Sequence, residues 1–219
     1  MALASRFKLP VITLIDTPGA YPGLESEERG IAEAIGSTIS VMSDLPTPIV
    51  SAIIGEGGSE GALALSVADR ILMLENAIYS PIAPEAAAWL LYRDVGRVDE
   101  VASSLKLTAH DCRAFGIIDM LVPEPEGGAH TDFDEAAREL GRLLVQALLD
   151  VQMTFNRTLL RKRYKKFRKM GTYSTIFHST LANEATNVQT KLVRSGRELI
   201  DRFYGKPRPS QKGRSREAR

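Results

Sequence analysis

The stretch IVSAIIGEGGSEGALALSVA, residues 49–68, constrains the fold more than any other part of the chain. Its apolar beginning at residues 49–54 predicts a buried strand, the glycines at 55–58 predict a turn, and the Ala- and Leu-rich segment from Ser59 predicts a helix. The first N–H groups of a helix lack intrahelical partners and lie at the positive end of its dipole. The stretch therefore suits binding of a phosphate, a carboxylate or a developing oxyanion, and it suits a structural turn equally well.

Strands and helices alternate along the rest of the chain, which predicts the α/β class. Further apolar or β-branched runs predict strands at residues 11–15, 70–74, 78–80 and 117–122. Apolar spacing and capping residues predict helices at residues 1–7, about 25–42, 85–92, 98–105, 109–115 and about 132–153. The second of these helices has its apolar stripe at Ala32, Ile35, Ile39 and Met42.

Composition excludes several classes of protein. A formal net charge of +1 argues against a nucleic-acid binder over the whole chain. The single cysteine, Cys112, excludes an internal disulfide and a multi-cysteine zinc site, and it fits a reducing compartment. No apolar run approaches the length that crosses a membrane. We therefore expect a soluble, cytoplasmic protein without a metal site and without a membrane partner.

The character of the chain changes after Gln152 and predicts three regions. Residues 1–153 are expected to form the α/β core. Residues 154–204 are expected to form a helical extension, which begins with a basic helix at 157–171. This extension continues with a coiled-coil-like seam at Leu181, Ala185, Val188, Leu192, Leu199 and Phe203. Residues 205–219 are rich in Lys, Arg, Pro, Ser and Gly, which predicts a disordered basic tail.

A series of strings resembles one family, the α subunit of the carboxyltransferase component of bacterial and plastid acetyl-CoA carboxylase. The strings occur in the family's order and cover most of residues 1–171. They are LPVITLIDTPGAYPG (9–23), EERG (27–30), IGEGGSEGALAL (54–65), DRILMLENAIYS (69–80), LKLTAHD (105–111), GIIDMLVPEPEGGAH (116–130) and RYKKFRKMG (163–171).

This resemblance implies a crotonase-like (ClpP/crotonase) fold, a spiral of ββα units, here with a helical C-terminal extension. It implies transfer of a carboxyl group from carboxybiotin to acetyl-CoA, giving malonyl-CoA for fatty acid biosynthesis. The implied partners are a β-type carboxyltransferase subunit, in a hetero-oligomer such as α2β2, and a biotin carboxyl carrier protein. The resemblance further implies that the complete complex binds ATP.

The resemblance also implies an oxyanion hole of backbone N–H groups for the ureido oxygen of biotin. The matching donors are Gly19 or Ala20 in the first loop and Gly57 or Gly58 in the glycine segment. No side-chain base is required, because biotin itself can take the proton. Tyr21 and Tyr79 are candidates for the wall of the carboxybiotin pocket, with core packing as the alternative.

Glu60 departs from the family pattern, which usually has glycine at this position. A carboxylate in the first turn of a helix is electrostatically favourable, so a structural role is one interpretation. Together with Glu85 it could instead form the carboxylate pair of a crotonase-type enoyl-CoA hydratase or isomerase.

The segment from Gly57 to Gly61 also satisfies the G-x-S-x-G pattern of serine hydrolases. A triad would then require Ser59, an acid such as Asp119, and His130 or His178. The alternative role for Ser59 is that of a helix N-cap.

Members of this family have a long segment before the residues that match Met1. Three explanations are open: a truncated record, a second polypeptide that supplies this half, or a non-catalytic assembly subunit. An unfinished sheet predicts an exposed strand edge and exposed apolar surface, and hence dependence on a partner.

Overall fold

A parallel sheet carries the fold, and the computed structural model describes residues 1–153 and 156–171 of the chain. The strand order is β1-β2-β3-β5, with β4 (Ile78–Ser80) paired to the end of β2. The ranges are Val11–Thr17 for β1, Ile49–Gly58 for β2, Arg70–Leu74 for β3 and Met120–Val122 for β5. All pairs are parallel, which confirms the predicted α/β class.

The central strand β2 is longer than its sequence predicts. The glycines at 55–58 are not a turn, because Glu56, Gly57 and Gly58 pair with β4. Gly57 also pairs with Thr17 of β1. Glycine normally weakens a strand, and here the pairing on both sides holds the glycine segment in extended form.

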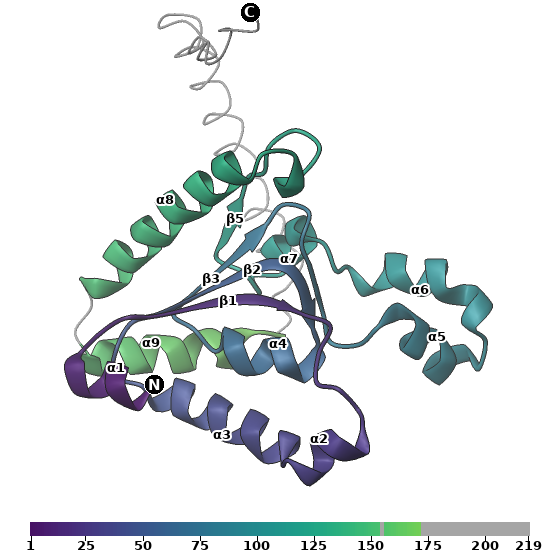
Figure 1. Ribbon diagram of the computed structural model, residues 1–219, viewed down its shortest axis with the longest axis horizontal. Helices are drawn as coiled ribbons and strands as arrows, with labels where there is room; N and C mark the ends of the chain where they lie inside the picture. The colour runs from purple at the N-terminus through teal and green to yellow at the C-terminus, as the bar shows by residue number, and fades with distance from the viewer. Residues whose placement is uncertain (154–155, 172–219) are drawn as a thin grey trace, which may run out of the picture. The chain divides into compact units, whose positions relative to one another are not determined.

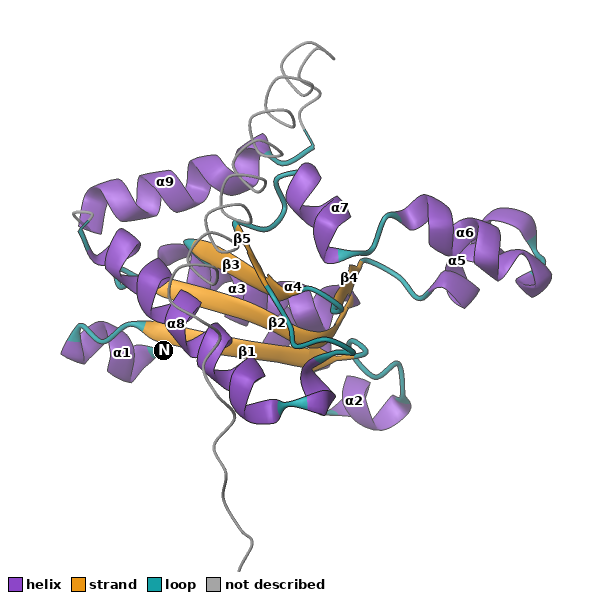
Figure 2. Ribbon diagram, turned by 90° about the horizontal axis from the view of Figure 1, so that it is seen from above, coloured by secondary structure: helices purple, strands orange, loops and turns teal. Residues whose placement is uncertain are grey.

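Helices cover both faces of this sheet (Figures 1 and 2). The long helix α8 (Phe133–Gln152) lies along one face, and α3 (Ile31–Asp44), α4 (Ser59–Ser66) and α9 (Asn156–Lys169) lie along the other. The remaining helices are α1 (Ala2–Phe7), α2 (Leu24–Glu28), α5 (Pro84–Tyr92), α6 (Val98–Leu105) and α7 (Ala109–Ala114). Short 3-10 helices span Val95–Arg97 and Ala129–Thr131.

Local residues explain the boundaries of several helices. The Thr108 side chain accepts a hydrogen bond from the backbone N–H of Asp111 and so caps α7, as predicted. Gly116, with a φ of 70°, follows the end of that helix, also as predicted. The single helix predicted for residues 25–42 is wrong, because Gly30 adopts a φ of 74° and separates α2 from α3.

The hydrophobic core lies between the sheet and these helices. Ile49, Val50, Ala52 and Ile53 of β2 are fully buried, as expected for a central strand that is covered on both faces. The predicted stripe of α3 is only partly inside: Met42 is fully buried and Ala32 is exposed. The strand predicted at 117–122 forms only at Met120–Val122, although Ile118 packs into the core.

Helices α5 and α6 form a separate arm, residues 84–105, that extends away from the sheet (Figures 1 and 2). The arm has its own small core of Ala87, Ala88 and Val101. Its outer surface carries exposed apolar side chains, namely Trp89, Leu90, Leu91, Tyr92 and Val95.

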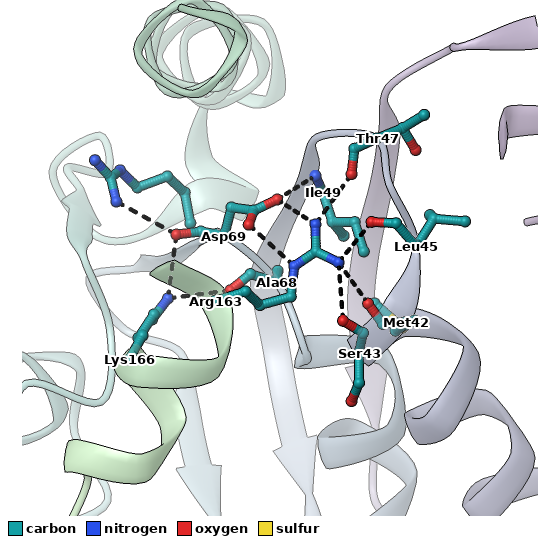
Figure 3. Close-up of polar contacts among 10 residues, drawn as sticks. Met42, Ser43, Leu45, Thr47, Ile49, Ala68, Asp69, Arg163 and Lys166 are labelled. Carbon is teal, nitrogen blue, oxygen red and sulfur yellow. Dashed lines mark hydrogen bonds and ion pairs between the residues drawn. The ribbon is translucent and has the colours of Figure 1, made fainter. Parts of the chain in front are cut away.

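A buried arginine fastens α9 to the sheet (Figure 3). The guanidinium of Arg163 donates to both carboxylate oxygens of Asp69, at 3.0 and 2.7 Å. It also donates to the backbone carbonyls of Met42 and Leu45 at the end of α3, and to that of Thr47. Arg163 therefore joins α9 to the end of α3 and to Asp69, which lies just before β3.

These contacts place α9 in the same compact unit as the sheet, Met1–Gly171. The part of the predicted extension up to Gly171 thus packs with residues 1–153. The predicted seam and tail, residues 181–219, lie outside the described residues.

The strand β1 forms an edge of the sheet, where among the described residues it pairs only with β2. Its side chains Ile12 and Leu14 are 46% and 54% exposed, although both are large and apolar. Leu3, Phe7 and Leu9 add further exposed apolar surface just before this strand. The predicted exposed edge and apolar surface are therefore present.

Candidate functional site

The loop that follows β1 lies directly against the glycine segment of β2 and the start of α4. A Cβ atom on Gly58 would lie 2.0 Å from the carbonyl oxygen of Pro18, and one on Gly61 would lie 3.1 Å from the carbonyl carbon of Gly19. The backbone leaves no room for a side chain at Gly58, and at Gly61 it would have to shift by a few tenths of an ångström to accept one. The structure thus brings the predicted residues Gly19 and Gly58 together, and it explains why the sequence has glycine at these positions.

An irregularity in the β1–β2 pairing shapes this contact. The register passes from Ile15–Ile53 to Thr17–Gly57, so β2 carries two more residues than β1 over this step. The side chain of Asp16 accepts the backbone N–H of Glu56 at 2.9 Å and replaces a bond of the ladder.

The first loop is held by a side chain of β1. Gly19 donates its N–H to the Thr17 hydroxyl oxygen at 3.2 Å, and the hydroxyl donates to the Gly19 carbonyl at 3.4 Å. Among residues 1–153 and 156–171, by contrast, the N–H of Ala20 makes no hydrogen bond. Of the two loop residues predicted as donors, Ala20 therefore has the free N–H group.

The start of α4 differs from the prediction for Ser59. Gly58 is the N-cap, no side chain caps the helix, and Ser59 is its first residue, with a φ of 50°. The Ser59 hydroxyl donates to the carboxylate of Glu60. This bond, together with the backbone N–H of Glu60 itself, lowers the pKa of that carboxyl group. An ionised carboxylate therefore lies at the positive end of α4.

The two tyrosines predicted for a biotin pocket lie in different surroundings. The ring of Tyr79 lies against Gly57, and its hydroxyl is 2.6 Å from the Ser66 hydroxyl on α4. Burial raises the pKa of Tyr79, and the side chain packs against the main core. Tyr21 is 71% exposed, so its ring is open to a ligand.

The serine-hydrolase set does not assemble within the described residues. Asp119 precedes β5 and pairs with Lys166 at 2.5 Å, whereas Ser59 follows β2. Because the strands are parallel, the two residues lie at opposite ends of the strands. His130 is exposed, and His178 lies outside the described residues. Glu85 is an exposed residue in the first turn of α5, and it makes no hydrogen bond with Glu60 among the residues that the structure describes.

A second polar cluster lies beyond the ends of β3 and β5. Glu124 accepts the N–H groups of Asn76 and Ala129 at 2.8 and 2.7 Å. Burial raises the pKa of Glu124, but these bonds and the Asn76 side chain outweigh it, so the net pKa is lowered. The groove here has a volume of about 500 Å³, and its walls include Glu75, Glu126 and His130. Sequence reasoning missed Glu124, although the string PEPEGGAH contains it.

The described part of the chain contains neither a cluster of metal-ligating side chains nor a membrane-spanning helix. Within residues 1–153 and 156–171, no group of three or more His, Cys, Asp or Glu side chains could hold a metal ion. No helix in these ranges has the length and apolar character needed to span a bilayer.

The fold is that of carboxyltransferases and their crotonase-like relatives. A chain of the Pseudomonas malonate decarboxylase hetero-tetramer in complex with coenzyme A matches with a TM-score of 0.60 and 18% identity, over 89% of this chain and 74% of that one. A chain of transcarboxylase 12S matches with a TM-score of 0.58 and 20% identity, over 69% of this chain and 29% of that one. The crotonase-like fold is thereby confirmed.

Sequence comparison gives the family. The family model "Acetyl co-enzyme A carboxylase carboxyltransferase-like" matches residues 1–171, and the chain belongs to this family. Among its relatives are the acetyl-coenzyme A carboxylase carboxyl transferase α subunits of Fusobacterium nucleatum and Thermus thermophilus. Both are 48% identical, and the matches cover 78% and 80% of this chain and 55% and 56% of those proteins. The chain thus spans about half the length of the curated relatives it matches.

Proposed function

We propose that this chain supplies the α-type half of a carboxyltransferase site, which transfers a carboxyl group from carboxybiotin to acetyl-CoA and gives malonyl-CoA. One observation carries the proposal: the TPGA loop after β1 packs against the EGGSEG segment at residues 56–61. Two backbone elements with N–H donors therefore meet at the carboxyl ends of β1 and β2. Family membership over residues 1–171 supports the same reaction.

The donors offered here suit an oxygen that becomes negative. They are the free N–H of Ala20 and the first-turn N–H groups of α4 other than that of Glu60, which the Glu60 carboxylate accepts. Neutral donors fixed by the fold stabilise developing charge without reorganising, and removing one typically costs about 3–4 kcal/mol of barrier. Carboxybiotin, when bound, would supply the carboxyl group, and the biotin that has given up this group would take the methyl proton of acetyl-CoA, so this chain needs no side-chain base.

The partners in this proposal are a β-type subunit, which completes the site, and a biotin carboxyl carrier protein. A hetero-oligomer such as α2β2 follows, acting in fatty acid biosynthesis in the cytoplasm. The hetero-tetramer of the Pseudomonas malonate decarboxylase offers a parallel for such an assembly. Tyr21 remains a candidate for the pocket wall because it is exposed. No observation on this chain supports ATP binding by the complex, and ATP is not part of the proposal.

A non-catalytic assembly role is the second candidate, and Glu60 favours it. Its carboxylate lies at the start of α4, where it competes with any anionic ligand for the same positive potential. In this role the chain would have the same fold and bind the same partner subunit, but it would not catalyse carboxyl transfer.

Reconstitution tests the proposal. The chain is purified alone and together with a β-type partner, and malonyl-CoA-dependent carboxylation of biocytin is measured. Activity is expected only in the mixture, and Gly58→Ala should abolish it because the new Cβ would collide with Pro18. Gly36→Ala in α3 is the matched control, since a Cβ there meets nothing within 4 Å. A stable but inactive complex would leave the assembly role as the better account.

A further inference from the structure

The two N–H groups of the first loop are not equivalent. The N–H of Gly19 is bound to the Thr17 hydroxyl at 3.2 Å, which withdraws it from any ligand. The N–H of Ala20 makes no hydrogen bond within residues 1–153 and 156–171. A threonine that bonds the backbone two residues further on is a known turn device, and here it decides which donor of the loop stays available.

We infer that Thr17 is a positioning residue of the site, which fixes the loop so that, of Gly19 and Ala20, Ala20 presents its N–H to a ligand. The inference rests on the proposed function and deepens it. Thr17 does not touch the reacting atoms; it acts through the backbone of Gly19, because its hydroxyl bonds both the N–H and the carbonyl of that residue.

Three observations make Thr17 suited to this role. It is the last residue of β1, and it pairs with Gly57 directly after the step in the register, so its own backbone is anchored. Its hydroxyl is part-buried, so water competes for it less than at an exposed site. The residue it holds, Gly19, has a φ of 124°, a conformation that favours glycine and that the two hydroxyl bonds help to maintain.

The loop also has little space to shift. A Cβ on Gly19 would lie 3.2 Å from the Cβ of Ser59 and 3.3 Å from the Gly58 carbonyl oxygen. The loop backbone is therefore already in contact with the start of α4. The contact with α4 blocks movement of the loop toward that helix but not away from it. If the Thr17 bonds are lost, the Gly19 peptide can rotate or move away from α4, and the Ala20 N–H moves with it.

The test compares three variants in the reconstituted complex. Thr17→Val keeps the shape of the side chain and removes the hydroxyl, whereas Thr17→Ser keeps the hydroxyl. Thr13→Val is the structural control: Thr13 lies on the same strand, and its hydroxyl donates to Leu65 of α4 at 2.7 Å, away from the loop. Biocytin carboxylation is measured with malonyl-CoA as the varied substrate, alongside the melting temperature of each complex.

Thr17→Val is expected to lower kcat by about 10- to 100-fold and to leave KM for malonyl-CoA within about 2-fold, because a misplaced donor acts on the transition state. Thr17→Ser should restore kcat to within about 3-fold of the unmodified chain. Thr13→Val should lower the melting temperature without lowering kcat. An unchanged kcat in Thr17→Val, with an active parent complex, overturns the inference and leaves the proposed function intact.

Amide hydrogen exchange at Gly19 gives a readout that does not depend on turnover. We expect the Gly19 amide to exchange slowly in the parent complex and fast in the Thr17→Val complex. The Ala20 amide should exchange fast in both. Fast exchange at Gly19 in the parent complex overturns the inference even if the complex is active. An inactive parent complex with the expected exchange pattern contradicts the proposed function while the loop geometry stands.

Discussion

Glu60 lies where a backbone anion site would otherwise be open. Its carboxylate accepts the Ser59 hydroxyl and its own N–H, which lowers its pKa and keeps it ionised at neutral pH. The residue is exposed, so it is not needed to fill space. Its charge therefore acts mainly on what can bind at the start of α4.

Replacing Glu60 tests this effect. Glu60→Gly should raise kcat for biocytin carboxylation by about 3- to 10-fold, because one negative charge is removed beside developing negative charge, an effect of about 1 kcal/mol. Glu60→Gln separates charge from size and should give most of the gain. A rate that falls to background in both variants would contradict this expectation and would show that carboxyl transfer needs the Glu60 carboxylate.

At the scale of elements, Arg163 is the buried charged side chain that joins α9 to the rest of the fold. Arg163 is 2% exposed, and its charge is balanced by Asp69, which is 7% exposed. The guanidinium also satisfies carbonyls at the end of α3, which would otherwise lack partners. Removing one member of a buried ion pair leaves an uncompensated charge in the interior.

We therefore expect Arg163→Met to destabilise the fold by about 3–5 kcal/mol, which is a large fraction of the stability of a typical domain. The neighbouring exposed Lys165 provides the control, and Lys165→Met should change stability by no more than about 0.5 kcal/mol. Urea denaturation followed by circular dichroism measures both. Equal denaturation midpoints for the two variants would show that Arg163 does not fasten α9.

Much of this architecture could be predicted from local patterns, and the exceptions have long-range causes. The strands predicted at residues 11–15 and 70–74 and the cap at Thr108 follow from residues near in sequence, although the first strand extends to Thr17 in the structure. Gly55 to Gly58 were predicted as a turn because the pairing of β2 with β4 is invisible from local sequence.

The basic helix gives the same lesson. RYKKFRKMG has the appearance of a solvated helix, but Arg163 points inward to a carboxylate 94 residues earlier. For the candidate site, the family resemblance implied that the loop after the first strand and the glycine segment lie together. It could not show that Thr17 occupies the N–H of Gly19, since that depends on the torsion angles of the loop.

At the scale of the whole molecule, the edge strand β1 is the exposed feature with the largest consequence. Ile12 and Leu14 are exposed large apolar side chains on a strand whose outer edge is unpaired within the described ranges. Such edges recruit other strands, and natural proteins usually protect them with charge or cover them.

The isolated chain should therefore self-associate at micromolar concentration, and the double change Ile12→Lys with Leu14→Lys should reduce this association. Phe115→Lys is the control, because Phe115 is 62% exposed but lies beside α7, away from the edge. Light scattering with size-exclusion chromatography measures both. Equal association in both variants would exclude the β1 edge as the adhesive surface.

The ion pair of Asp69 and Arg163 also limits the order in which contacts can form during synthesis of the chain. The two residues are separated by 94 positions. At synthesis rates of about 5–20 residues per second, Asp69 is made about 5–20 s before its partner. During that interval the Asp69 carboxylate can accept the Ile49 N–H but lacks its cationic partner. The ion pair that joins β3 to α9 therefore forms only after Arg163 has left the ribosome, long after the strands β1 to β3 have been made.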